Sequence, residues 1–271
     1  MSDVLRARPE LAYHDAEFLD GDEARPVRIL AEYIHPRSQL EQQGVHDTIV
    51  FFGSARLQRQ GQLGKYYDEA RELARLFTQW SLSIRPERQR CLICSGGGGG
   101  IMEAANRGAA DAGGRTLGFN IGLPHEQHPN PYITPELSFE FHYFFMRKLW
   151  FAHLARAVVA FPGGFGTLDE LFEMLTLSQT GKLERPIPVL LYGAKYWNEV
   201  VNFEAFVRHG TISESDLSLF RMVDDPQETL RFLQQVVPEN VGPEPTGFAR
   251  SVTCRRSDGT CHNSSAQRKE N

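Results

Sequence analysis

Residues 91–107 read CLICSGGGGGIMEAANR, and residues 157–172 read AVVAFPGGFGTLDELF. Each stretch begins with a short apolar run, passes through a glycine cluster and continues with apolar residues at helical spacing. This order predicts a strand, a tight turn and a helix, because glycine permits backbone conformations and close approaches that a Cβ atom would block. The two stretches therefore predict an α/β fold with a glycine turn after each of two strands.

The same alternation extends through most of the chain. Apolar strands are predicted at residues 48–53, 116–121, 137–141 and 187–192, and helices at residues 64–80, at 144–156 and after Gly193. Short, continuously apolar strands separated by amphipathic helices are typical of a parallel sheet that is covered on both faces. We therefore predict a Rossmann-like, doubly wound parallel sheet. Ligands of such sheets bind beyond the carboxyl ends of the strands, where both glycine clusters fall.

Composition changes divide the chain into three predicted parts. Residues 1–45 form an N-terminal extension with a short helix that begins near Pro26 and is closed by Pro36. Residues 46–238 form the nucleotide-binding domain, and residues 239–271, rich in Pro, Gly, Ser, Thr and Arg, form a flexible polar tail.

Charge and hydropathy exclude several classes of partner. The 271 residues carry a formal net charge of −5, which provides no basic field for a nucleic acid. No apolar run approaches the ~20 residues of a membrane span, and the first residues lack the cationic and then apolar order of a signal peptide. We expect a cytoplasmic protein with neither a nucleic-acid nor a membrane partner.

The cysteines and histidines do not predict a metal site or a disulfide. Cys91 and Cys94 form a C-x-x-C pattern, but residues three apart in a strand point to opposite faces, so we expect two buried thiols. Cys254 and Cys261 lie in the polar tail. His125 and His128 lie in a proline-rich segment without a recognised ligand spacing. We therefore expect no metal and no other cofactor.

The five consecutive glycines after Ser95 predict a small-anion site. A phosphate at the start of the following helix would meet free N–H groups and the positive end of the helix dipole. The alternative is a tight turn that has only a structural role. The run is not a dinucleotide fingerprint, because Glu103 stands where G-x-G-x-x-G requires its third glycine, and no P-loop occurs in the chain.

Glu170 has two interpretations that are compatible with each other. Thr167-x-x-Glu170 matches a capping box, with threonine at the N-cap position and glutamate at N3. A carboxylate in the first helical turn is also stabilised in its charged form by the helix dipole, so we expect Glu170 to stay ionised at neutral pH. An ionised carboxylate suits the stabilisation of a cation or the activation of water.

Arg147 and Lys148 are adjacent cations in an aromatic-rich helix. They could simply extend to the surface past their apolar neighbours. Alternatively, a surface-facing arginine could clamp a phosphate or hydrogen-bond a base.

The motif PGGFGTLDE at residues 162–170, the Gly100-Ile101-Met102 sequence upstream and the intervening Arg147-Lys148 together resemble the LONELY GUY family, often labelled "lysine decarboxylase-like". The resemblance extends from about Thr48 to Leu233. It implies a Rossmann-type phosphoribohydrolase that cleaves a purine or cytokinin nucleoside 5′-monophosphate to the free base and ribose 5-phosphate. It also implies that Arg147 and Glu170 form the catalytic pair. The candidate substrate-binding residues are Gly53, Ser54, Gly97, Gly98, Gly100, Met102, Lys148, Gly163, Gly164, Phe165, Gly166 and Thr167.

The chain departs from the family pattern just before Arg147, where residues 144–148 read FFMRK in place of the family's Met-His-Glu-Arg-Lys. No lysine here has the setting of a pyridoxal phosphate site, so we expect no decarboxylase. Family members are commonly dimers, and the aromatic residues 141–151 suggest a buried partner surface, so we expect a homodimer. The alternative function is that of a nucleotide-binding regulatory protein with the same fold but without turnover.

Overall fold

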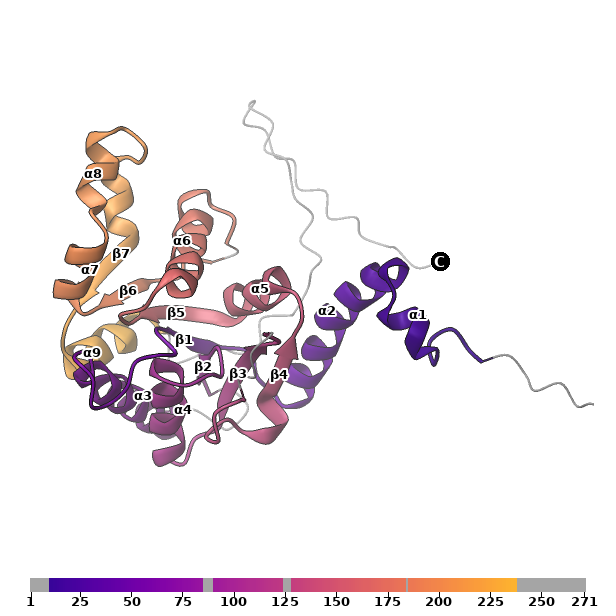
Figure 1. The fold of residues 1–271 in the computed structure, drawn as a ribbon. Helices are drawn as coiled ribbons and strands as arrows, with labels where there is room; N and C mark the ends of the chain where they lie inside the picture. The colour runs from indigo at the N-terminus through magenta and orange to yellow at the C-terminus, as the bar shows by residue number, and fades with distance from the viewer. Residues whose placement is uncertain (1–9, 85–89, 124–127, 184, 238–271) are drawn as a thin grey trace, which may run out of the picture. The chain divides into compact units, whose positions relative to one another are not determined.

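The computed structural model describes residues 10–84, 90–123, 128–183 and 185–237 (Figure 1). The helices and strands alternate over most of this range, as the apolar periodicity predicts. In chain order they are α1 (Ala16–Asp20), η1 (Asp22–Ala24), α2 (Arg25–Gln42), β1 (Thr48–Phe52), α3 (Lys65–Ile84), β2 (Leu92–Ser95), α4 (Ile101–Asp111), β3 (Thr116–Ile121), η3 (Pro135–Leu137), β4 (Ser138–Phe141), α5 (Phe144–Leu154), β5 (Ala155–Ala160), α6 (Phe165–Gln179), β6 (Val189–Tyr192), α7 (Ala194–Val200), α8 (Phe203–Arg208), η4 (Glu214–Leu219), β7 (Phe220–Val223) and α9 (Pro226–Val236).

The strands form one parallel sheet in the order β4-β3-β2-β1-β5-β6-β7. The chain winds outward from β1 to β4, returns to the centre and winds outward again from β5 to β7. The winding reverses between β1 and β5, and ligands of doubly wound sheets bind at the carboxyl ends of the strands near such a reversal. The prediction of a doubly wound, Rossmann-like sheet is confirmed.

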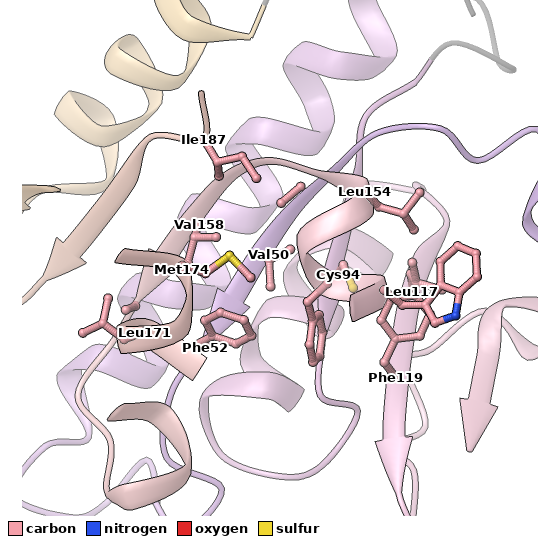
Figure 2. Close-up of a cluster of buried hydrophobic side chains, with 14 of the residues drawn as sticks. Val50, Phe52, Cys94, Leu117, Phe119, Leu154, Val158, Leu171, Met174 and Ile187 are labelled. Atoms are coloured by element: carbon pink, nitrogen blue, oxygen red, sulfur yellow. The ribbon is translucent and has the colours of Figure 1, made fainter. Parts of the chain in front are cut away.

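Each central strand contributes to two separate apolar layers. Along β1, Ile49 and Phe51 pack with α3, α4 and α9, whereas Val50 and Phe52 pack with α2, α5 and α6 on the opposite face. The two groups of helices lie on opposite sides of the sheet (Figure 1). Figure 2 shows part of the second layer, where Phe52 lies near Leu171 of α6. The near-complete burial of both strand faces explains why the strands read as continuous apolar runs rather than alternating patterns.

The helix of the N-terminal extension is longer than the sequence predicts. The helix α2 spans 18 residues and continues through Pro36, so the prediction that Pro36 closes it is wrong. Proline lacks an N–H group and therefore leaves the carbonyl of the residue four positions earlier, Glu32, without its usual helical partner. The indole Nε1 of Trp150 in α5 donates to this carbonyl at 3.1 Å. A donor from outside the helix thus replaces the hydrogen bond that the helix loses at Pro36.

The expectation for the two cysteines of the C-x-x-C pattern is confirmed. Both are buried, and they belong to different apolar layers, Cys94 on the face of α5 and α6 and Cys91 on the face of α3 and α4. His125, Cys254, Cys261 and the predicted tail lie outside the described residues. Within the described ranges no group of three or more His, Cys, Asp and Glu side chains is placed to hold a metal ion. No helix among these residues is long and apolar enough to cross a membrane.

Candidate functional site

Three loops meet at the carboxyl ends of the central strands: Gly53-Ser54 after β1, residues 96–100 after β2 and residues 161–164 after β5. The backbone of Ser54 links the other two loops, since its N–H donates to the carbonyl of Pro162 at 3.0 Å and its carbonyl accepts the N–H of Ile101 at 3.1 Å. A Cβ atom on Gly53 would lie 2.6 Å from the Ile101 side chain. Gly53 therefore allows the start of α4 to pack against the end of β1.

The turn between β2 and α4 requires glycine for two reasons. Gly97 and Gly100 have positive φ angles of 76° and 62°, which side-chain-bearing residues rarely adopt. A Cβ atom on Gly97 would lie 2.0 Å from Asn120 Oδ1, and one on Gly100 would lie 2.1 Å from the carbonyl oxygen of Ser54. Both the backbone conformation and the close packing therefore exclude other residues.

A buried network of polar side chains fixes this turn. Ser95 Oγ accepts the N–H of Gly97 at 3.0 Å and donates to Asn106 Oδ1 at 2.6 Å. Asn130 Nδ2 donates to the carbonyls of Gly97 and Gly98, both at 3.1 Å, and to Asn106 Oδ1 at 2.9 Å. Sequence reasoning missed these residues. One signal for this network was present in the sequence. Asn106 is a polar residue on the buried face of α4, among small and apolar residues, and a buried polar side chain requires hydrogen-bond partners.

The turn between β5 and α6 is open. Gly164 and Gly166 are exposed, and a Cβ atom built on either would meet nothing within 4 Å among the described residues beyond its neighbours in the chain and the backbone of α6. The side chain of Phe165 between them is 92% exposed. Tyr196 Oη of α7 donates to the Gly163 carbonyl at 2.8 Å and so holds the inner half of the turn.

The predicted capping box at the start of α6 is wrong. The helix begins at Phe165 with Gly164 as its N-cap, so Thr167 is already the third helical residue. The Leu168 N–H donates to the Gly164 carbonyl at 3.0 Å, which sets this earlier start. Thr167 is instead buried beside Gly163, where a Cβ atom would lie 2.1 Å from its Oγ1. Among the described residues, no side chain caps the start of α6.

Arg147 of α5 and Glu170 of α6 form an ion pair behind these turns. Arg147 Nη2 donates to Glu170 Oε1 at 2.9 Å, and the two side chains are 10% and 12% exposed. The prediction of a surface-facing Arg147 is wrong, since the ring centroids of Phe144 and Phe151 lie 5.4 and 5.7 Å from its Cζ. Its Nε is buried and has no hydrogen-bond partner among the described residues. A buried guanidinium with an unused donor is suited to an anionic or polar ligand.

Burial changes the acidity of Glu170. Removal from water raises the pKa of its carboxyl group to about 7, against the opposing attraction of Arg147. The expectation that the helix dipole keeps Glu170 ionised is therefore wrong. Glu170 is the sixth helical residue, beyond the first turn where the dipole acts most strongly. Near neutral pH both protonation states are populated, which suits a group that takes up and releases a proton.

Of the remaining predicted site residues, Met102 lies close to this pair, whereas Lys148 has other partners. A Cβ atom on Gly96 would lie 2.7 Å from Met102 Sδ and 3.7 Å from Arg147 Nη1, so the first glycine turn and Met102 reach the ion pair. Lys148 Nζ is instead paired with Asp169 at 3.1 Å and with Glu173 at 2.8 Å. These carboxylates of α6 partly neutralise Lys148, and its role in phosphate binding stays a prediction.

Comparison with known proteins identifies relatives of the chain. Residues 102–233 match the family model described as "Possible lysine decarboxylase". Cytokinin riboside 5′-monophosphate phosphoribohydrolase LOG7 of Arabidopsis thaliana is 31% identical over 156 residues, which cover 56% of this chain and 70% of the relative. Its counterpart LOG4 of Oryza sativa subsp. japonica, named as probable, is 30% identical over 151 residues, 55% of this chain and 64% of the relative.

Among solved structures, the X-ray structure of TM1055, a Northeast Structural Genomics Consortium target, superposes with a TM-score of 0.50 at 21% identity. The match covers 70% of this chain and 99% of that one, and it supports the fold. The similarity to LOG7 in sequence, which extends over more than two thirds of that protein, identifies the family. The chain belongs to the LONELY GUY (LOG) family.

Proposed function

We propose that this protein hydrolyses the N-glycosidic bond of a nucleoside 5′-monophosphate. In this reaction the bond between ribose C1′ and the base nitrogen breaks, the oxygen of water bonds to C1′ and a proton of that water is transferred to the departing base. The products are the free base and ribose 5-phosphate. The observation that carries the proposal is the buried Arg147–Glu170 pair, with an unpartnered Arg147 Nε, beside two glycine turns that open helices.

The open turn at the start of α6 suits the phosphate. Its first N–H groups lack a side-chain cap, and they lie at the positive end of the helix dipole. Because Gly164 and Gly166 carry no side chain, a phosphate can approach the backbone closely at this point. The adjacent turn before α4 also lacks a side-chain cap, and Met102 lies in its first helical turn.

Glu170 and Arg147 suit the bond cleavage. Loss of the base leaves positive charge on the ribose ring, which an ionised carboxylate stabilises electrostatically. The ionised form of Glu170 also accepts a proton from the attacking water, and a pKa near 7 permits its later release. Arg147 orients this carboxylate, and its unused Nε donor is available to the phosphate or to the departing base.

The substrate class follows from the relatives, which are named for cytokinin riboside 5′-monophosphates. We propose purine nucleoside monophosphates such as AMP, together with their cytokinin counterparts. The test is incubation with a panel of nucleoside 5′-monophosphates, including a cytokinin riboside monophosphate, with the released base measured by liquid chromatography. Adenosine, which lacks the phosphate, is the matched control and should be cleaved far more slowly.

The alternative of a nucleotide-binding regulatory protein predicts a different result from the same panel. Calorimetry would detect binding of a monophosphate, while no base would appear after prolonged incubation with the folded protein. That result would contradict the hydrolase proposal and would favour the regulatory alternative.

We also propose that the protein is a homodimer. Three apolar side chains of α5, Phe144, Phe145 and Leu149, are 50%, 49% and 38% exposed, and an apolar surface of this kind is commonly covered by a partner. Light scattering after size-exclusion chromatography should give twice the mass of one chain. A Phe145→Ser, Leu149→Ser variant should give a larger fraction of monomer, whereas a monomeric wild-type protein would refute the proposal.

A further inference from the structure

The helix that carries Arg147 has no capping residue of its own. Tyr143 occupies the N-cap position of α5 and makes no side-chain cap bond. The backbone N–H groups of His142 and Tyr143 instead donate to the carboxylate of Glu32 in α2, at 2.6 and 3.2 Å. A carboxylate at this end of a helix satisfies N–H groups that would otherwise lack partners and interacts favourably with the dipole. The cap of α5 is therefore supplied by a residue 111 positions earlier in the chain.

Glu32 holds α5 at a second point through its backbone. Trp150 Nε1 donates to the Glu32 carbonyl, which is left available because Pro36 lacks the N–H that would otherwise bind it. The rings of Tyr33 and Trp150 are stacked with centroids 5.8 Å apart. One residue of α2 thus contacts both the start of α5 and its second turn.

These contacts lead directly to the candidate catalytic pair. The Glu32 carboxylate accepts a hydrogen bond from the N–H of Tyr143, and the Tyr143 carbonyl accepts one from the N–H of Arg147 at 3.2 Å. The Arg147 guanidinium in turn donates to Glu170. Arg147 lies between the two points at which Glu32 fixes the helix. A small shift of α5 would therefore change the distance between Arg147 and Glu170.

We propose that Glu32 is a positioning residue, which anchors α5 from the N-terminal extension and thereby sets Arg147 against Glu170. The kinetic part of this inference rests on the proposed hydrolase function. The geometric part does not. The N-terminal extension accordingly has a role in the chemistry of the site as well as in folding.

The test compares Glu32→Ala and Trp150→Phe with a matched control, Glu41→Ala. Glu41 lies on the same helix, but its carboxylate pairs with the exposed Arg37 of that helix. The first two variants should lower kcat by about 10- to 100-fold, the scale of a misplaced catalytic group, while KM changes much less. Glu32→Gln, which keeps one acceptor oxygen, should be intermediate. The control should keep both constants.

A second readout does not depend on turnover. The carboxyl carbon of Glu170, assigned by its absence in Glu170→Gln, is followed by NMR across pH. In Glu32→Ala, loss of the Arg147 contact should raise the titration midpoint of Glu170 by about half a pH unit or more. The other charged or titratable groups that face Glu170 are unchanged in this variant: Lys148 of α5, Asp169 and Glu173 of α6 and Cys94 of β2.

The outcomes separate the two proposals. If the wild-type protein releases no base from any monophosphate, the hydrolase function fails, and the NMR titration alone decides on Glu32. If Glu32→Ala melts at a lower temperature but keeps the wild-type kcat and Glu170 midpoint, Glu32 only stabilises the fold and the inference is overturned. A raised midpoint in Glu32→Ala, absent in Glu41→Ala, supports it.

Discussion

The two glycine turns of this protein have similar sequences and different environments. The first, Ser95 to Gly100, is largely buried, and its backbone is bonded to the side chains of Ser95 and Asn130, which Asn106 links. The second, Pro162 to Gly166, is exposed from Gly164 onward, and a Cβ atom at Gly164 or Gly166 would contact no other side chain of the described residues. Gly97 and Gly100 in the first turn are required by the protein's own packing, whereas Gly164 and Gly166 in the second leave space at the surface.

This difference shows that glycine content alone does not identify a ligand site. In the first turn, positive φ angles and close contacts with Asn120 and Ser54 account for Gly97 and Gly100 without any ligand. In the second, Gly166 has ordinary helical geometry, and nothing within the described residues explains the absence of a side chain. We therefore propose that the first turn serves mainly as a scaffold and that the second mainly binds the phosphate.

The largest expected effect is that of Gly97→Ala on stability. A positive φ and a contact of 2.0 Å with Asn120 should together cost about 2–4 kcal/mol of unfolding free energy. The control is Gly99→Ala, whose Cβ atom would lie 3.4 Å from the nearest atom, a carbonyl oxygen, and it should cost less than about 1 kcal/mol. Urea denaturation measures both. Equal effects of the two changes would contradict the assignment of Gly97 to the scaffold.

The second expected effect is on the pH dependence of turnover. The polar groups that fix the first turn are hydroxyls and amides, which do not titrate in the working range, whereas Glu170 behind the second turn has a pKa of about 7. Because the proposed mechanism uses the ionised form of Glu170, kcat/KM should rise about tenfold per pH unit below 7 and level off above it. A flat profile between pH 5 and about 8 would exclude Glu170 as the titrating group.

Stability should follow the opposite trend with pH. The raised pKa means that the folded protein holds the Glu170 proton more tightly than the unfolded chain. This contribution is fully present below the ordinary value of 4.5 and is lost as pH rises through about 7. Glu170→Gln should lack it, so the difference in unfolding free energy between the two proteins should change between these pH values.

The smallest expected effect is that of Gly166→Ala. Alanine favours the helix over glycine, so the variant should be equally stable or more stable by about 0.5–1 kcal/mol. Its methyl group would nevertheless occupy space at the open turn, and KM for the monophosphate should rise about tenfold, the scale of weakening one charged hydrogen bond. A loss of stability like that of Gly97→Ala, or an unchanged KM, would mean that the two turns do not differ as we infer.

The order of strands and helices could be predicted from the sequence because each central strand is buried on both faces and reads as one apolar run. The strand β7 was missed, since its residues are mostly half-exposed and only Val223 is buried. The length of α2 was missed because a proline was taken to end the helix, although Trp150 supplies a donor for the carbonyl that Pro36 leaves free. A donor that lies so far away in the sequence cannot be predicted from the residues around Pro36.

The candidate site could be predicted only as a set of residues. The pairing of Arg147 with Glu170 agrees with the motif, but its burial depends on how α5 and α6 pack, which no local pattern gives. The capping box failed because α6 starts two residues earlier than Thr167. Glu32 and Asn130 were missed since each acts on backbone groups distant in sequence, and hydrogen bonds of this kind leave no periodic signal.

The proposal that Glu170 drives glycosidic cleavage is tested most directly by Glu170→Gln with the best monophosphate from the substrate panel. Glutamine keeps an acceptor for Arg147 but carries no negative charge, so the protein should remain folded and bind the nucleotide. The wild-type protein should release the base, and the variant should do so with kcat lower by ~100-fold or more, the scale of losing one preorganised electrostatic group. A variant that binds the monophosphate and releases the base at nearly the wild-type rate would contradict the proposed mechanism.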